Sequence, residues 1–479
     1  MNEQRHVIKR QIIELHSSSQ QTTSAAQTLQ AEMSRIYRQR IVPLIEQVCS
    51  ELSQPDRLYR LDSVQIDVGT LDPHNLEADI VAKVRTQLRQ VLAAEIERQE
   101  QVAKPQTQRP QTRSQLELFA VFARTGSLPW WADTAQPDVL TACLQQLLQT
   151  APQALRQLMR QLAQEKRPCR RLALSFSDTE LAQLVALLLP AQQTDAQAFV
   201  QLVISSKRGR NIQHTAWTSL LSVAGLAQTE WTEVVVYTAV CNQIAHTLGI
   251  RTGTFLTDLH KTVQKERPAA ELSHLIDTLY QQSATIKQVV KQPTRDDELE
   301  ADADEAAFNV YGIEELYVAN AGLVILWPFL SHFFGRLDLL QGREFKDRQA
   351  QQQAAVLLQY LATAETDSPE YVLPLNKLLC GLPLTAVFDL SEPFSEAEIE
   401  ECSALLQAAI SQAPILRQMS VAGFRESFLQ REGVLRSRDG AWLLQVEKET
   451  YDVVLERFPW SWEWVKLPWM ETALRVEWL

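Results

Sequence analysis

The stretch FPWSWEWVKLPWM, residues 458–470, places four tryptophans within thirteen residues, and six of the 11 tryptophans in the chain lie in its last 38 residues. Trp460, Trp462 and Trp464 recur with a period of two, so in a strand all three side chains point to one face. The same alternation returns in LRVEWL, residues 474–479. The end of the chain is therefore predicted to contain strands with one apolar face.

Upstream of this stretch the sequence predicts helices followed by a hairpin. The helices are predicted at about 318–335, 347–363, 371–380, 395–412 and 420–431, the fourth beginning with a capping box at Ser395 and Glu398. In the hairpin, residues 435–447, Trp442, Leu444 and Val446 share one face and Asp439-Gly440 supplies the turn. The C-terminal part is thus predicted to pack a small antiparallel, tryptophan-rich sheet on helices.

Three roles compete for the C-terminal tryptophans: the packed face of the sheet, a protein interface, and a platform for a glycan. The period of two favours the packed face for Trp460, Trp462 and Trp464. A membrane belt is excluded because Glu463 interrupts the stretch and no long apolar segment flanks it. Trp469, beside Pro468 in a predicted turn, is expected to be the exposed tryptophan.

The first hundred residues predict a β-α-β-α unit. Its elements are a strand at Val7–Leu15, a helix at about Ala25–Leu52, a strand containing Val64, Ile66 and Val68, and a helix from Asp72-Pro73 to about Arg98. The alternation of the second strand indicates one face in water. This unit would be the α/β end of a chain that is otherwise mainly helical.

The chain is too long for one hydrophobic core, so several domains are expected. The predicted divisions are an N-terminal α/β domain at 1–103, a proline-bearing linker at 104–115, a helical middle region at 116–292, an acidic linker at 293–306 and a C-terminal α+β domain at 307–479. The fold class is therefore mainly α with small β elements.

The composition excludes several classes of protein. A net charge of −12 argues against a general nucleic-acid binder, and the basic runs at 166–171 and 207–210 are interpreted as solvated helix ends or loops. The N-terminus does not have the pattern of a secretory signal, and Val318–Gly335 is too interrupted to span a membrane. The six scattered cysteines indicate reduced core thiols, which predicts a cytoplasmic protein.

The motifs of the common enzyme classes are missing from the sequence. There is no phosphate-binding loop, no G-x-G-x-x-G, no H-E-x-x-H and no G-x-S-x-G. Cys380 lies among leucines and is interpreted as a buried thiol, and Asp302 and Asp304 lack the turn glycine of a calcium loop, since Ala307 is in its place. We therefore predict no catalytic residues, no cofactor and no metal.

Several long strings together resemble the tape measure family of phage-tail-like contractile injection systems. They are RLDSVQIDVGTL, FARTGSLPWWA (122–132), VANAGLVILWPFL (318–330), AAVLLQYLATAE (354–365), LPLNKLLCGLPL (373–384), FRESFLQREGVL (424–435), TYDVVLERFPW and KLPWM. The candidate core or interface residues in these strings and in the tryptophan stretch are Trp130, Trp131, Asn376, Lys377, Arg425, Glu426, Trp460, Trp462, Trp464 and Trp469.

The resemblance implies a structural assembly protein with no enzymatic activity and no cofactor. It implies a role in setting or terminating tube length, and partners among the inner tube, baseplate hub or cap proteins. We further expect assembly in the cytoplasm, and the sequence leaves open whether the chain is retained within the mature particle.

Two mechanisms are compatible with this resemblance, and a function of another class competes with it. A fully helical chain of this length would reach roughly 700 Å as an extended ruler. However, 20 prolines and the absence of a sustained heptad favour compact domains joined by linkers. Either the middle helices alone extend inside the tube, or the protein is an assembly factor or cap that acts at one end of it; we favour globular ends with an adaptable helical middle. The function of another class is a ligand-binding module that uses the C-terminal tryptophans.

Overall fold

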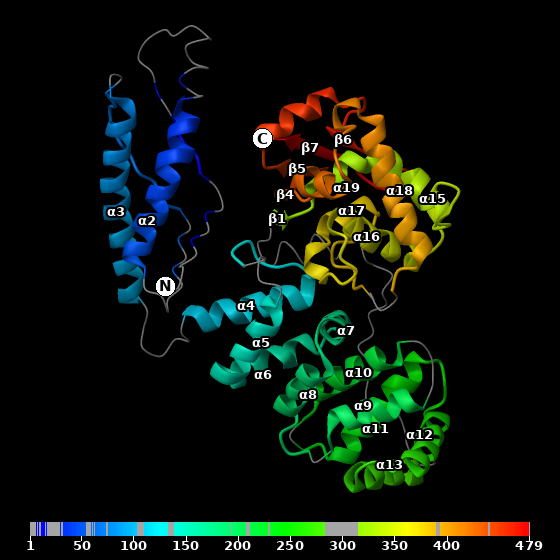
Figure 1. Cartoon of the computed structure of the whole chain (residues 1–479). Coiled ribbons are helices and arrows are strands. Elements are labelled where there is room, and N and C mark those ends of the chain that lie inside the picture. Colours follow the sequence, from blue (N-terminus) through cyan, green and yellow to red (C-terminus); the bar gives the residue numbers. More distant parts are fainter. Residues whose placement is uncertain are drawn as a thin grey trace. The chain divides into compact units, whose positions relative to one another are not determined.

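The computed structural model describes most of the chain and divides it into two compact units, Met1–Gln115 and Leu116–Leu479. The described residues are 32–53, 63–72, 75–102, 110–132, 138–192, 194–206, 211–228, 230–282, 315–388, 393–438 and 441–478, with residues 6, 8, 11–14, 16, 29, 59 and 61. Figure 1 shows the elements of each unit, coloured along the chain. The predicted acidic linker at 293–306 lies outside the described residues.

The first unit is built on a pair of helices. A π-helical turn η1 (Tyr37–Ile41) leads into α2 (Val42–Leu52), which packs against α3 (Leu76–Val102). The shared core repeats at helical spacing and consists of Met33, Ile36, Ile41, Leu44, Val48, Ile80, Val84, Leu88 and Leu92. The two predicted helices of this unit are therefore confirmed.

The two predicted strands of the first unit are wrong for its described residues. Residues 11–14 and 63–69 belong to no strand. A strand requires a hydrogen-bonded neighbour, whereas Ile66 and Val68 instead pack directly onto the helix pair. The alternation of the second segment thus reflects extended chain that packs on helices, and the described residues of this unit do not form the predicted β-α-β-α arrangement.

An array of helices forms the first part of the second unit, and its first helix, α4, begins six residues before the boundary at Leu116. They are α4 (Pro110–Thr125), α5 (Val139–Thr150), α6 (Pro152–Leu162), α7 (Lys166–Ser175), α8 (Asp178–Leu188), α9 (Ala196–Ser205), α10 (Ile212–Leu226), α11 (Glu233–Thr247), α12 (Thr252–Glu266) and α13 (Ala270–Gln282). The helical middle predicted from the sequence is confirmed. Residues 110–115, predicted as linker, are the first turns of α4.

Helix α10 is the centre of this array. It contacts α6, α7, α8, α9 and α11 (Figure 1). Trp217 on α10 is fully buried. The Trp217 indole donates to Asp178 Oδ1 at 2.7 Å, so its polar atom is satisfied inside the core. A Cβ on Gly225 would lie 2.3 Å from the Ala163 Cβ, which explains why α10 carries glycine where α6 passes.

The C-terminal part of the unit combines short helices with two sheets. Its elements are β1 (Glu315–Val318), η2 (Ala321–Leu326), α15 (Trp327–Arg336), β2 (Leu340–Gln341), β3 (Glu344–Phe345), α16 (Arg348–Thr363), η3 (Glu370–Val372), α17 (Pro374–Leu379), α18 (Glu396–Gln412), η4 (Pro414–Leu416), α19 (Val421–Phe424), η5 (Arg425–Leu429), β4 (Gly433–Arg438), β5 (Ala441–Val446), η6 (Thr450–Arg457), β6 (Trp464–Val465) and β7 (Leu474–Trp478). The capping box of Ser395 and Glu398 is present. The mainly α fold with small sheets is confirmed.

The predicted helix at 318–335 is only partly correct. Val318 ends strand β1, residues 321–326 form a 3₁₀ segment, and an α-helix begins only at Trp327. Pro328 explains the late start, because proline lacks a backbone N–H and fits best in the first turn of a helix. Leu330, Phe333 and Phe334 are buried in the core, as a core helix requires.

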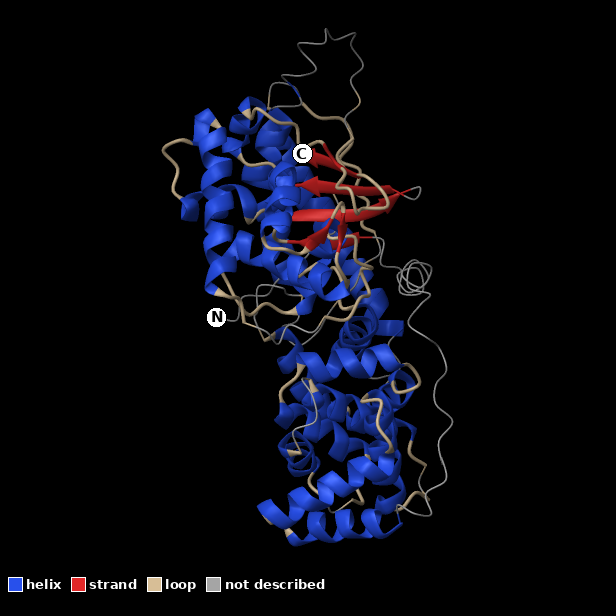
Figure 2. Ribbon diagram, turned by 90° about the vertical axis from the view of Figure 1, so that its right-hand side faces the viewer, coloured by secondary structure: helices blue, strands red, loops and turns tan. Residues whose placement is uncertain are grey.

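The five-stranded sheet has the order β1-β4-β5-β7-β6 and is mixed (Figure 2). The hairpin of β4 and β5 is confirmed, with Leu444 and Val446 fully buried; its turn, Asp439-Gly440, lies outside the described residues. The prediction of an antiparallel sheet is wrong for β5 and β7, which pair in parallel. Between β5 and β7 the chain runs through η6 and β6, so that β7 starts at the same end of the sheet as β5. Two parallel strands require such a crossover connection.

Candidate functional site

Arg171 on α7 is a fully buried guanidinium that joins three segments of the second unit. Its Nη1 donates to the Ala123 carbonyl at 2.8 Å, its Nη2 to the Thr385 carbonyl at 2.6 Å, and its Nε to Glu370 Oε2 at 3.0 Å. Each nitrogen of the guanidinium therefore has an acceptor. The contact from α7 to Glu370 spans 199 residues of sequence and ties the helical array to the C-terminal part.

Lys377 on α17 completes the cluster from the other side. Its Nζ donates to Glu370 Oε1 at 2.7 Å and to the carbonyls of Leu384 and Ala386, both at 2.9 Å. The ammonium also lies 4.9 Å from the centre of the Phe388 ring. Arg171, Glu370 and Lys377, which we call the buried ion network, thus hold two cations around one carboxylate.

Glu370 is ionised because of its two partners. Burial raises the pKa of its carboxyl, but the adjacent Arg171 and Lys377 lower it by more, so the pKa lies below the usual range for glutamate. Both carboxylate oxygens accept charge-assisted hydrogen bonds. The network is therefore a fully paired set of buried charges, which favours a single arrangement of the segments that it joins.

Gly126 lies directly against this network. Its φ is +75°, and a Cβ at this position would lie 2.3 Å from Glu370 Oε1 and 3.0 Å from Arg171 Nε. Any side chain would displace the carboxylate. The glycine of FARTGSLPWWA is thus required by backbone conformation and by the space that the ion network occupies.

A second buried polar cluster joins three of the sequence strings listed above. Asn320 Nδ2 donates to Gln359 Oε1 and to Asn376 Oδ1, both at 2.7 Å, and Asn376 Nδ2 donates to the Ala355 carbonyl at 2.9 Å. All three side chains are at most 6% exposed. Asn376 therefore belongs to the interior of the C-terminal part and fixes how α16, α17 and η2 meet.

The other candidate residues are distributed between the core and the surface. Arg425 donates to the Leu361 carbonyl at 3.0 Å, whereas the neighbouring Glu426 is exposed. Trp131 packs against the core of the helical array, and Trp130 is half-buried. The structure therefore does not bring these four residues together with Asn376 and Lys377 into one site.

The tryptophan stretch does not form the predicted single-faced strand. Only Trp464 lies in β6, where it is 59% exposed. The indole N–H of Trp460 donates to the Ile325 carbonyl at 3.0 Å. The ring of Trp462 packs edge-on against that of Trp478, with 4.9 Å between the ring centres. These indoles anchor an irregular segment to the core.

The prediction that Trp469 is the exposed tryptophan is wrong. Trp469 is only 7% exposed, and its indole donates to the Leu379 carbonyl at 2.9 Å. The centre of the indole ring lies 4.8 Å from the ring centre of Phe345 and 5.7 Å from that of Phe334. The turn at Pro468 directs this side chain inward, whereas Trp464 is the exposed one.

Sequence reasoning missed the charged partners in the interior. Besides Arg171 and Glu370, it missed Arg431. The guanidinium of Arg431 donates from Nη1 to Asp452 Oδ1 at 2.6 Å and from Nη2 to Asp452 Oδ2 at 2.7 Å. The indole of Trp478 donates to the same carboxylate at 2.8 Å. A possible signal was the apolar context of Arg171, which is followed by Leu172 and Ala173 on the buried side of α7.

The described residues were searched for groups that could hold a metal ion and for helices that could cross a bilayer. No group of three or more His, Cys, Asp or Glu side chains there could hold a metal ion, and no described helix has the length and apolar character needed to cross a bilayer. Cys380 is fully buried, and burial raises the pKa of its thiol well above the ordinary value. Burial likewise raises the pKa of Cys169 to about 12, so both are protonated core residues.

Comparison with known proteins gives one finding. A protein-family model described as contractile injection system tape measure protein matches residues 5–478. Comparisons with the curated proteins and with the solved structures gave no match.

Proposed function

The chain belongs to the contractile injection system tape measure protein family, and from this premise we propose that it is an assembly protein that sets or terminates tube length. We propose further that it does so as folded units and not as an extended helical ruler. Its partners would be the inner tube, the baseplate hub or the cap of the particle. Assembly would take place in the cytoplasm, with the chain retained in the particle.

The buried ion network is the observation that supports the folded form most strongly. Extending residues 116–479 along a tube would separate Arg171 from Glu370 and break the ion pair between them. Extension would return both charges to water, but it would lose the single arrangement that the fully paired network favours and would expose the hydrophobic cores of the helical array and the C-terminal part. A mechanism that keeps this network intact is therefore favoured over one that opens it.

The lengths of the helices support the same proposal. The longest described helix of the second unit, α18, has 17 residues and spans about 25 Å, and α3 in the first unit has 27 residues and spans about 40 Å. A ruler needs continuous helix over hundreds of ångströms. The short, mutually packed helices favour a body that acts at one end of the tube.

The tryptophans give little support to a ligand-binding module. Trp460 and Trp469 donate to backbone carbonyls of the protein itself, and Trp462 is packed against Trp478. A sugar platform needs an exposed aromatic face, and of the four tryptophans in residues 458–470 only Trp464 is more than half exposed. The assembly function therefore remains the proposal.

Deleting the gene from the producing cells tests the proposed function. We expect particles to be absent, or their length distribution to be altered, because an assembly factor determines where tube growth stops. Electron microscopy of the particle fraction measures this, with cells that carry a plasmid copy of the wild-type gene as the control. Particles of normal number and unchanged length in the deletion strain would contradict the proposal.

A further inference from the structure

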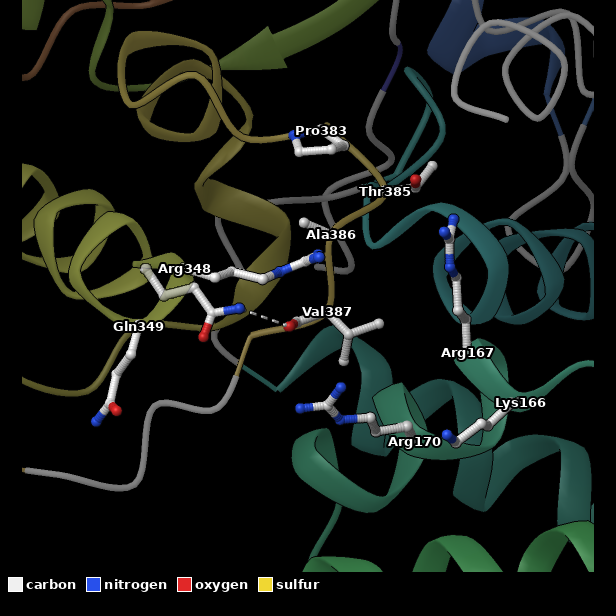
Figure 3. Close-up of a pocket in the computed structure, with 10 residues that line it drawn as sticks. Lys166, Arg167, Arg170, Arg348, Gln349, Pro383, Thr385, Ala386 and Val387 are labelled. Carbon is white, nitrogen blue, oxygen red and sulfur yellow. Dashed lines mark hydrogen bonds between the residues drawn. The ribbon is translucent and has the colours of Figure 1, made fainter. Parts of the chain in front are cut away.

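The cavity between α7, α16 and residues 383–387 of the second unit is lined in part by cations that already have partners. It measures about 260 Å³, and Figure 3 shows Arg167 and Arg348 among its lining residues. Each of these two arginines takes part in an interaction with another residue. The cavity therefore gives no reason to expect a bound anion.

The first unit buries few apolar side chains for its length. Among its described residues, nine hydrophobic side chains are buried in the core that includes α2 and α3. Five large ones are exposed, and these are Ile8, Ile12, Ile13, Val42 and Val64. Single exposed apolar residues are normal in soluble proteins, but a small core beside several exposed β-branched side chains is typical of a surface that meets a partner.

One of these exposed side chains belongs to the segment 63–69, which packs on the helix pair of α2 and α3. Val64, Ile66 and Val68 alternate along this segment and share one face. Ile66 and Val68 are half-buried against the helix core, whereas Val64 is 38% exposed. The apolar face of the segment is therefore covered at one end and open at the other.

The backbone of this segment has unused hydrogen-bonding capacity. Within the described part of the chain, residues 63–68 form no backbone–backbone hydrogen bond, and the N–H of Gly69 donates to Asp67 Oδ1 at 2.8 Å. Extended chain with unpaired N–H and C=O groups is a template for pairing with another strand. The segment therefore needs only a neighbouring strand to become part of a sheet.

The sequence of the segment is complementary to itself in an antiparallel pair. When Ile66 of one copy lies opposite Ile66 of a second copy, Val64 lies opposite Val68 and Gln65 lies opposite Asp67. Apolar side chains then meet on the helix side, where Val64 gains cover, and the Gln65 amide meets a carboxylate on the other face. A shift of the register by one residue would place apolar side chains opposite polar ones.

The charge of the first unit also suits a second copy. Residues 1–115 contain 15 Lys or Arg and 14 Asp or Glu, which gives a net charge of +1. Residues 116–479 contain 31 Lys or Arg and 44 Asp or Glu, which gives a net charge of −13. Because like charges repel, two copies approach each other more easily at the nearly neutral first unit than at the second unit.

We propose that two copies of this chain associate through the segment 63–69, which forms an antiparallel strand pair across a twofold axis. The twofold passes beside Ile66 and repeats each contact twice. The interface is small, so we expect a reversible dimer with a dissociation constant of roughly 1–100 µM. The proposal concerns the purified chain and does not rest on the proposed function.

Sedimentation velocity of the full chain over a range of concentrations tests the proposal. We expect a monomer–dimer equilibrium that Gln65→Asp weakens by about threefold to tenfold, because the new carboxylate lies opposite Asp67 of the second copy at two symmetric positions. Gln65→Lys should tighten the dimer by a similar factor. The matched controls are Gln90→Asp and Gln90→Lys, which make the same charge changes at an exposed position on α3 and should leave the dimer unchanged.

A disulfide across the twofold tests the register. In a Cys49→Ser background, which removes the one cysteine that is not buried, Ile66→Cys should form a covalent dimer on oxidation. The paired Cα atoms would lie about 4.5–5.5 Å apart, within reach of a disulfide. Val64→Cys is the control, because its two copies would lie about 14 Å apart along the strands, too far for a disulfide.

Three results would overturn the proposal. A monomer at every concentration up to about 100 µM would show that the segment does not recruit a second copy. A dimer that neither Gln65 variant changes, or that the Gln90 variants change equally, would place the contact elsewhere. Cross-linking that is equally fast in Val64→Cys and Ile66→Cys would contradict the antiparallel register. Since Gln65 is exposed, its variants report on the dimer even where Ile66→Cys does not fold.

Discussion

We expect the substitution Glu370→Gln to lower the free energy of unfolding of the second unit by about 3–5 kcal/mol. The amide leaves Arg171 and Lys377 buried, at 0% and 1% exposure, with no counter-charge between them. Urea unfolding followed by tryptophan fluorescence measures this directly. All 11 tryptophans lie between Trp130 and Trp478, so the signal reports on the second unit alone.

Two comparisons make the Glu370 experiment specific. Glu477→Gln alters a partly exposed carboxylate that pairs with the exposed Arg475 at 2.9 Å, and it should cost at most about 1 kcal/mol. The second comparison is the pH dependence of the free energy of unfolding. The pKa of Glu370 is lowered in the folded chain, so its contribution is full above the unfolded value of about 4.3 and is lost as the pH falls through the folded pKa. The difference between wild type and Glu370→Gln should therefore shrink below about pH 4.3.

A loss of less than about 1 kcal/mol in Glu370→Gln would contradict the role of the ion network. A difference between wild type and variant that stays constant as the solution is acidified would contradict the ionised state of the carboxylate. Either result would remove the main support for residues 116–479 acting as one folded unit.

Trp469→Ala is expected to lower the free energy of unfolding by about 3–5 kcal/mol. The substitution removes an indole that contacts Phe334 and Phe345 and that donates to the Leu379 carbonyl. It also removes the indole beside Gly381, where a Cβ would lie 3.5 Å from Trp469 Cδ1. The same urea titration gives the value.

Trp464→Ala is the matched control for this substitution, because it lies five residues away and is 59% exposed. We expect its effect to remain within about 0.5 kcal/mol. Equal losses in the two variants, or a larger loss at Trp464, would contradict the inward orientation of Trp469. Such a result would instead support the prediction, made from the turn at Pro468, that the Trp469 side chain is exposed.

Much of the helical fold follows from the sequence because its signals are local. The capping box of Ser395 and Glu398 and the breaker at Gly126 lie within a few residues of the helix ends that they specify. The hairpin of β4 and β5 is equally local. Such features are determined by near neighbours, so a single sequence is enough to predict them.

The errors occur where distant segments decide the structure. The alternation of Ile66 and Val68 is the same in a strand and in an extended segment that packs on helices. Only the neighbouring element, another strand or a pair of helices, distinguishes the two structures. Arg171 lies in a basic run beside exposed Lys166 and Arg170, and its acidic partner is 199 residues away. No local pattern identifies such a pair. Lys377, by contrast, is among the sequence candidates because it lies in LPLNKLLCGLPL, one of the strings that carry the family resemblance.

The length of particles assembled with an enlarged middle region tests the central claim most directly. Helical inserts of 28 and 56 residues would be placed after Gly249, which is exposed in the turn between α11 and α12 and has open space around it. A ruler predicts tubes longer by about 40 and 80 Å, from the rise of each helical residue. We predict unchanged tube length with intact particles, provided that tryptophan fluorescence shows wild-type unfolding of each variant. Lengthening in proportion to the insert would contradict the folded-unit mechanism.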